Sequence, residues 1–146
     1  MLAKPAIRQK QPRMPAPAPA FRLSVGHLDI QVFPWGDAEA DSEDADGIYD
    51  VSKDAIYIRA SRSPSEQLRI LLHEILHVIW DTWGMGEAAL TEEETCSKLD
   101  LGLVNVFKDN PHLIDLMAAV FKDGKGIFNV PQDCQRKARV KKPAQR

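Results

Sequence analysis

The chain has 146 residues, 44% of them hydrophobic, which is enough to bury the core of one compact domain. Its net charge of −2 hides an uneven distribution. Residues 1–22 carry five basic side chains and no acidic one, and residues 133–146 carry six basic and one acidic, so the part between them has a net charge of −12. No apolar run approaches the roughly 20 residues that span a bilayer, and the N-terminus lacks a signal-peptide core, so we expect a cytoplasmic protein without membrane contact.

Both ends of the chain are predicted to lie outside the folded domain, which we place at residues 21–132. Repeated prolines in "MPAPAPA" remove backbone donors and favour extended geometry, so residues 1–20 are expected to be a disordered basic arm. Residues 133–146 contain little core-forming sequence and are expected to be a disordered basic tail. These ends allow weak nucleic-acid contact, although no aromatic residues interleave them to stack on bases. Cys96 and Cys134 are isolated, which fits a reducing compartment better than a disulfide, and neither is chosen as a metal ligand.

Strand-type sequence occupies the part before residue 61. β-branched and aromatic residues predict a strand between Arg22 and Phe33. The sequence "GIYDVSKDAIYIRAS" predicts a hairpin, with strands at 48–51 and 55–60 joined by a polar turn. Between these two regions, "GDAEADSEDADG" carries six carboxylates and predicts a solvated loop. A calcium loop is the alternative, but the spacing does not match an EF-hand.

Helix-type sequence follows. A helix is predicted from Pro64 to Thr82, because Ser63 and Glu66 form a capping box and glycines follow the helix. Apolar residues on almost every side of it predict a buried helix. A second helix begins after Thr91 and ends before Pro111, and a third covers about 111–122. The expected fold is therefore α+β, a small and mainly antiparallel sheet packed on the first helix, with two further helices.

The first helix contains "HEILH", in which His73 and His77 lie at i and i+4 on one face, so their imidazoles converge. Zinc accepts such nitrogens, and Glu74 points about a third of a turn away, where its carboxylate can hydrogen-bond a metal-bound water. The alternative is a pair of core histidines satisfied by hydrogen bonds. Burying this trio without partners would cost about 2–7 kcal/mol for each polar group, which favours a shared metal ion.

A catalytic zinc site usually has three protein ligands and one open position. Three glutamates begin the second helix: Glu92, Glu93 and Glu94. Glu94 is the expected capping residue. Glu93 is preferred over Glu92 because it lies three positions before Cys96, which is predicted to be buried, and one turn before Ser97, whose hydroxyl could hold the carboxylate in place. Asp81, four residues after His77, is either a hydrogen-bond acceptor for that imidazole or a solvated residue.

The two remaining histidines are predicted to be structural or exposed. His27 lies in the first strand, and His112 lies in the opening turn of the third helix. His112 has a second interpretation, in which it reaches the cleft and stabilises a developing oxyanion.

From about Val25 to Asn110 the chain resembles the gluzincin type of zincin-like metallopeptidase, and more closely the small phage and prophage-encoded metallopeptidases related to the ImmA/IrrE-like group. The sequences that carry this resemblance are "GIYDVSKDAIYIRAS", "LLHEILHVIWD" and "EEETCSKLDLGLVNVFKDNP". The resemblance implies a zincin-like fold in a bacterial host cell, Zn²⁺ held by His73, His77 and one glutamate, and Glu74 as general base. The chain departs from the ImmA/IrrE-like pattern at "EETCSKL", where an E-A-x-x-F-A sequence is usual, so the third ligand stays open between Glu93 and Glu92.

Two functions follow. The first is a zinc-dependent peptidase that hydrolyses a protein or peptide substrate through a metal-activated water, with Glu74 as general base. The alternative is a non-catalytic zinc-binding phage accessory module that docks on a protein or nucleic-acid partner. A structural zinc site would be expected to use another Cys or His as its fourth ligand, and none is suitably spaced, which favours the enzyme.

Overall fold

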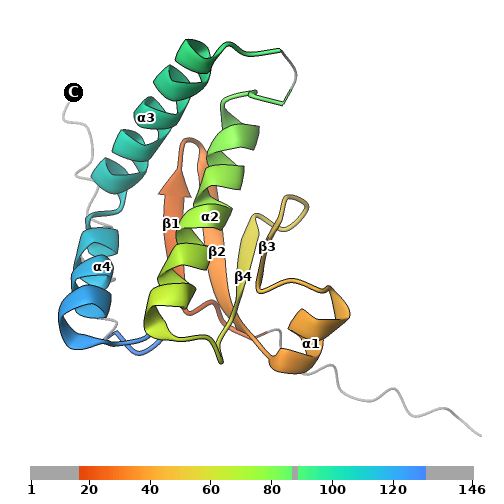
Figure 1. The fold of residues 1–146 in the computed structure, drawn as a ribbon, viewed down its shortest axis with the longest axis vertical. Coiled ribbons are helices and arrows are strands. Elements are labelled where there is room, and N and C mark those ends of the chain that lie inside the picture. Colours follow the sequence, from red (N-terminus) through yellow and green to blue (C-terminus); the bar gives the residue numbers. More distant parts are fainter. Residues whose placement is uncertain (1–16, 87–88, 131–146) are drawn as a thin grey trace, which may run out of the picture.

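The computed structural model describes residues 17–86 and 89–130. Within them, four strands form one mixed sheet in the order β1-β2-β4-β3 (Figure 1). The strands are β1 (Phe21–Val25), β2 (Leu28–Trp35), β3 (Gly47–Asp50) and β4 (Ala55–Arg59). The β1–β2 and β3–β4 pairs are antiparallel and the β2–β4 pair is parallel. The expected α+β class is confirmed. The sheet, expected to be mainly antiparallel, is mixed because the β2–β4 pair is parallel.

The segment predicted to hold a single strand folds as a hairpin. Gly26 turns the chain at φ 59°, a left-handed conformation that glycine adopts without strain. The exposed His27 follows it in the turn rather than in a strand. Alternate residues of β1 are buried, so this edge strand presents one apolar face to the core. The one hairpin that was predicted, β3–β4, is confirmed.

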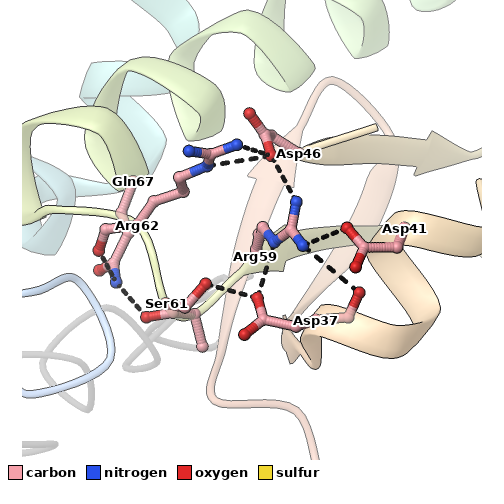
Figure 2. A network of polar contacts seen from close by, with 8 residues as sticks. Asp37, Asp41, Asp46, Arg59, Ser61, Arg62 and Gln67 are labelled. Atoms are coloured by element: carbon pink, nitrogen blue, oxygen red, sulfur yellow. Dashed lines mark hydrogen bonds and ion pairs between the residues drawn. The ribbon is translucent and has the colours of Figure 1, made fainter. Parts of the chain in front are cut away.

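The acidic segment predicted to be a solvated loop instead forms a short helix, α1 (Asp37–Ser42). Two of its carboxylates, Asp37 and Asp41, converge with Asp46 on a single arginine (Figure 2). Arg59 Nε donates to Asp37 Oδ1 at 2.7 Å, and its guanidinium also bonds Asp41 and Asp46. The segment is exposed as predicted, but the loop prediction was wrong because Arg59 binds these three aspartates and stabilises a helical turn.

Three longer helices complete the domain: α2 (Pro64–Thr82), α3 (Glu92–Asp109) and α4 (Pro111–Asp123). Helix α2 crosses one face of the sheet, and α3 and α4 lie on the β1 side of it (Figure 1). Both predicted capping boxes are present, at Ser63–Glu66 and Thr91–Glu94. The core lies between the sheet and these helices and includes Leu23, Ile30, Ile56, Ile58, Leu71, Ile75, Ile79 and Leu113.

Helices α2 and α3 are antiparallel, and their relative position is set by a close contact. A Cβ atom on Gly102 would lie 2.5 Å from Ile79 Cγ2, so only glycine lets the helices approach this closely. Further along, Lys98 Nζ donates to the Trp83 carbonyl at 3.2 Å. At the other end of α3, the buried Asn110 bonds both the backbone N–H and the carbonyl of Ser24, which joins the helix pair to β1.

None of the helices within 17–86 and 89–130 is both long and apolar enough to cross a membrane. Most of the predicted basic arm, at 1–16, lies outside the described residues. The predicted basic tail at 133–146, including Cys134, also lies outside them.

Candidate metal centre

The two histidines of "HEILH" lie on the side of α2 that faces the edge strand β3. Their Nε2 atoms are 3.2 Å apart and their rings are nearly perpendicular, at 84°. Two imidazole nitrogens on one tetrahedral zinc lie about 3.3 Å apart, given Zn–N distances of about 2.0–2.1 Å. Without a metal ion, the same 3.2 Å contact is a hydrogen bond between the two rings, and its length is close to the separation that a shared metal ion requires.

Glu74 lies between α2 and β3 and is only 5% exposed. Burial raises the pKa of its carboxyl group, an effect opposed by the positive charge of His77 and His73 and by a hydrogen bond from the Tyr49 backbone N–H. The strand is close here, because a Cβ atom on Gly47 would lie 3.2 Å from Glu74 Oε1. Glu74 is thus held against the backbone of the edge strand and beside both imidazoles.

A cleft of about 460 Å³ opens between α2 and β3 and contains this trio. One wall is made of residues from β3 and the turn after it, and the other of residues from α2. The lining comprises Gly47, Ile48, Tyr49, Val51, His73, Glu74, His77, Trp80 and Asp81.

The prediction that α2 is buried on almost every side was wrong. His73, Leu76, His77, Trp80 and Asp81 form an exposed stripe along the helix. The imidazoles therefore do not carry the desolvation cost that was expected to favour a metal ion, and only Glu74 is buried. The metal hypothesis now depends on the convergence of the two Nε2 atoms.

The structure does not bring the candidate third ligands to the histidines. Glu92, Glu93 and Glu94 occupy the exposed first turn of α3, and Glu94 is engaged in the predicted capping box. Gly102 on α3 contacts Ile79 on α2. Glu93 lies nine residues before Gly102, which is about 13 Å along α3 at about 1.5 Å per residue. Since the helices are antiparallel, this places Glu93 beyond the C-terminal end of α2. Within the described ranges, no group of three or more His, Cys, Asp and Glu side chains is arranged to hold a metal ion.

One reason for preferring Glu93 is also removed. Cys96 was expected to be buried, but it is exposed. The structure thus gives no packing argument that separates Glu93 from Glu92.

The other candidate residues are placed clearly. Asp81 lines the cleft beyond His77 and makes no hydrogen bond to it. His112 is buried on the far side of the core, where Nε2 lies 3.1 Å from the Arg22 carbonyl and Nδ1 has no partner among the described residues. Burial lowers the pKa of His112. It is structural, as first predicted, and does not line the cleft.

Sequence reasoning missed five cleft residues: Gly47, Ile48, Tyr49, Val51 and Trp80. Trp80 could have been found, because a residue three positions after His77 lies on the same side of a helix. Tyr49 and Val51 depend on how β3 is positioned over α2, which no local pattern encodes.

No protein-family model matches the chain, and no curated protein or solved structure matches it either. The functional argument therefore depends on the geometry of the cleft.

Proposed function

We propose that this chain is a zinc-dependent peptidase with a zincin-like plan. The observation that carries the proposal is the pair of Nε2 atoms 3.2 Å apart on one helix face, next to a carboxylate held against an edge strand. His73 and His77 would bind the zinc ion through these nitrogens. Zinc, when bound, polarises a carbonyl group and lowers the pKa of water.

Glu74 is the proposed general base. Its buried carboxylate has a raised pKa, so it accepts a proton more readily than an exposed glutamate does, and it can return that proton to a leaving amine. The hydrogen bond from the Tyr49 N–H fixes its position over the cleft. Such a positioned acid–base group contributes a factor of about 10²–10⁴ to rate.

The substrate class follows from the edge strand. In the sheet order, β3 has β4 on one side and no strand of the described residues on the other. An extended peptide can pair with such an edge through its own backbone, which would place its carbonyl groups beside the histidines. Proteins and peptides in extended conformation are therefore the proposed substrates.

The alternative function, a non-catalytic zinc-binding module that docks on a protein or nucleic-acid partner, has one observation in its favour. No third protein ligand lies beside the histidine pair within the described residues. The peptidase proposal therefore needs Glu93 or Glu92 to approach from the start of α3 when zinc binds, or needs water in that position. Zinc titration of the Glu93→Gln and Glu92→Gln variants distinguishes a glutamate ligand from water in that position. Zinc binding becomes weaker only when the replaced glutamate is a ligand.

The deciding experiment compares the wild type with Glu74→Gln, using zinc-loaded protein and a mixture of denatured proteins as substrate. We expect Glu74→Gln to keep its zinc and its melting temperature but to lose at least about 100-fold in peptide cleavage. Asp100→Asn, an exposed carboxylate on α3, is the matched control and should cleave normally. If the wild type and Glu74→Gln are equally inert while both bind zinc, the non-catalytic module replaces the peptidase.

A further inference from the structure

The cleft continues past the histidines into a region that we call the distal cleft, formed by Tyr49, Val51, Trp80 and Asp81. The Asp81 carboxylate is exposed and makes no hydrogen bond or ion pair with any described residue. It lies one helical turn beyond His77, so it faces the same cleft as the proposed metal ligands. A negative charge without an internal partner is thus present beside the reaction site.

One other carboxylate, Asp54, adds to the negative charge of this region. The Tyr49 hydroxyl is buried and has no hydrogen-bond partner among the described residues. The pKa of Tyr49 is raised by burial and then by the charges of Asp81 and Asp54. These two charges make the distal cleft unfavourable for an anionic group of a ligand.

Among the residues that the structure describes, no cation balances these charges. No lysine or arginine is found among the residues that line the cleft. Lys53 is near in sequence, but it forms an ion pair with Asp50 at 2.7 Å and lies over the Tyr57 ring. It lines a neighbouring pocket that shares Ile48, Tyr49 and Val51 with the cleft but contains neither histidine. By contrast, the three aspartates around α1 share Arg59.

The distal cleft also contains an aromatic surface. Trp80 is 43% exposed, which is unusual for so large an apolar side chain, and it is adjacent to Asp81 on α2. A tryptophan ring attracts a lysine or arginine cation that lies within about 6 Å of its centre. Carboxylate and aromatic ring together can therefore recognise the same positively charged group.

We propose that the distal cleft binds a lysine or arginine side chain of the peptide substrate, paired with Asp81 and stacked on Trp80. This inference rests on the proposed peptidase function, because it assigns a specificity to the same cleft. The basic residue would lie close to the scissile bond, since Asp81 is only four residues from His77 along the helix.

The test uses a set of otherwise identical peptides that contain Arg, Ala or Glu at each position beside the cleaved bond. Cleavage is measured with the zinc-loaded wild type, Asp81→Asn, Asp81→Lys and the control Asp100→Asn. We expect the wild type to prefer the best Arg peptide over its Ala counterpart by about five- to tenfold in kcat/KM, the size of one exposed ion pair plus one cation–π contact. Asp81→Asn should bring this ratio close to one, Asp81→Lys should favour Glu, and Asp100→Asn should keep the wild-type ratio.

Calorimetry of the same peptides binding to zinc-loaded Glu74→Gln separates the distal-cleft inference from the peptidase proposal. An Arg preference in binding that disappears when Asp81→Asn is added supports the distal cleft even if the wild type cleaves nothing, and then only the peptidase proposal fails. Equal binding and cleavage of Arg, Ala and Glu peptides overturns the inference while leaving the peptidase intact. A parallel loss of zinc affinity and of activity on every peptide in Asp81→Asn also overturns it, because Asp81 would then act by orienting His77.

Discussion

Two polar clusters border the edge strand β3, and they differ in how their charges are satisfied. In the first, Asp46 accepts hydrogen bonds from Arg59 and Arg62 just before the strand, and α1 completes the cluster around Arg59 (Figure 2). In the second, the cleft along the strand holds a buried glutamate, a pair of exposed imidazoles and the Asp81 carboxylate, which has no counter-ion among the described residues. Folding explains the first cluster completely, since every charge in it has a partner. In the second, the exposed Asp81 has no internal partner within the described ranges and stays available to a ligand, and this difference favours the cleft as the functional region that we propose.

The largest effect is expected on zinc binding, when one of the two proposed metal ligands in the cleft is replaced. His73→Ala should weaken zinc binding by more than about 100-fold, exceeding the 10–100-fold losses caused by replacing groups around metal ligands. His27→Ala removes a histidine from the exposed β1–β2 turn and should bind zinc like the wild type. Zinc content after dialysis and competition with a chromogenic chelator measure both. Normal zinc content in His73→Ala would show that the ligands lie elsewhere.

Gly47 connects the two clusters, since it follows Asp46 and packs against Glu74. A Cβ atom there would lie 2.3 Å from Ile70 Cγ2, so Gly47→Ala must push β3 away from α2. We expect a loss of about 1–3 kcal/mol in the free energy of unfolding, typical of overpacking. Urea unfolding measures it, and Gly84→Ala is the contrasting variant, because its Cβ atom would meet nothing within 4 Å and its cost would arise from the positive φ of 63°. Full stability in Gly47→Ala would mean that β3 is not held tightly.

Replacing Arg59 tests whether the satisfied cluster is structural. Arg59→Met keeps the length of the side chain but leaves the three aspartates of its cluster without their shared partner. We expect a lower melting temperature with unchanged zinc affinity, and only a moderate decrease because the aspartates are partly solvated. Raising the salt concentration should reduce the difference from the wild type, since screening weakens exposed ion pairs. A change in zinc affinity without a change in stability would reverse the roles that we assign to the two clusters.

Much of this arrangement could be predicted because it is encoded locally. The capping residues Ser63 and Thr91 determine where α2 and α3 begin, and the i, i+4 spacing brings His73 and His77 together whatever the surroundings. The position of α3 along α2 was not predictable, because it depends on Gly102 meeting Ile79 across the core. That one tertiary contact decides how far Glu93 lies from the histidines.

The helix α1 and the exposure of the imidazoles were missed for a related reason. Six carboxylates within twelve residues indicate a solvated loop, and the sequence does not reveal that Arg59 binds three of them and stabilises a short helix there. Similarly, apolar residues around α2 indicated burial, but the sheet and the other helices leave one side of it uncovered. Local sequence patterns specify the helices and strands, whereas the tertiary contacts between helices and strands specify the site.

One substitution within the cleft, Tyr49→Phe, is expected to have a smaller effect and to stabilise the protein rather than destabilise it. The Tyr49 hydroxyl is buried without a partner among the described residues, so Tyr49→Phe removes an unsatisfied polar group and keeps the ring. We expect the free energy of unfolding to stay unchanged or rise, by up to about 1 kcal/mol. Tyr57→Phe is the matched control on the other face of β4, and chemical denaturation of the metal-free proteins compares them. Destabilisation by Tyr49→Phe would show that the hydroxyl has a partner in the native protein.

The last prediction concerns His112, the exception to the rule that an unsatisfied polar atom identifies a functional region. Its Nδ1 atom is buried without a partner in the described part of the chain, yet it is far from the cleft and its Nε2 atom already faces the Arg22 carbonyl. Burial lowers its pKa in the folded state, so below the ordinary value of about 6.5 the unfolded chain binds a proton that the folded chain does not. The stability of the wild type should therefore fall as the pH decreases from about 6.5 towards the lowered pKa, while His112→Gln should lose less over the same interval. Urea unfolding of both metal-free proteins at several pH values from neutral to mildly acidic measures the two slopes. Equal slopes would contradict the structural role, because they would mean that His112 gains its proton as easily in the folded protein as in the unfolded chain.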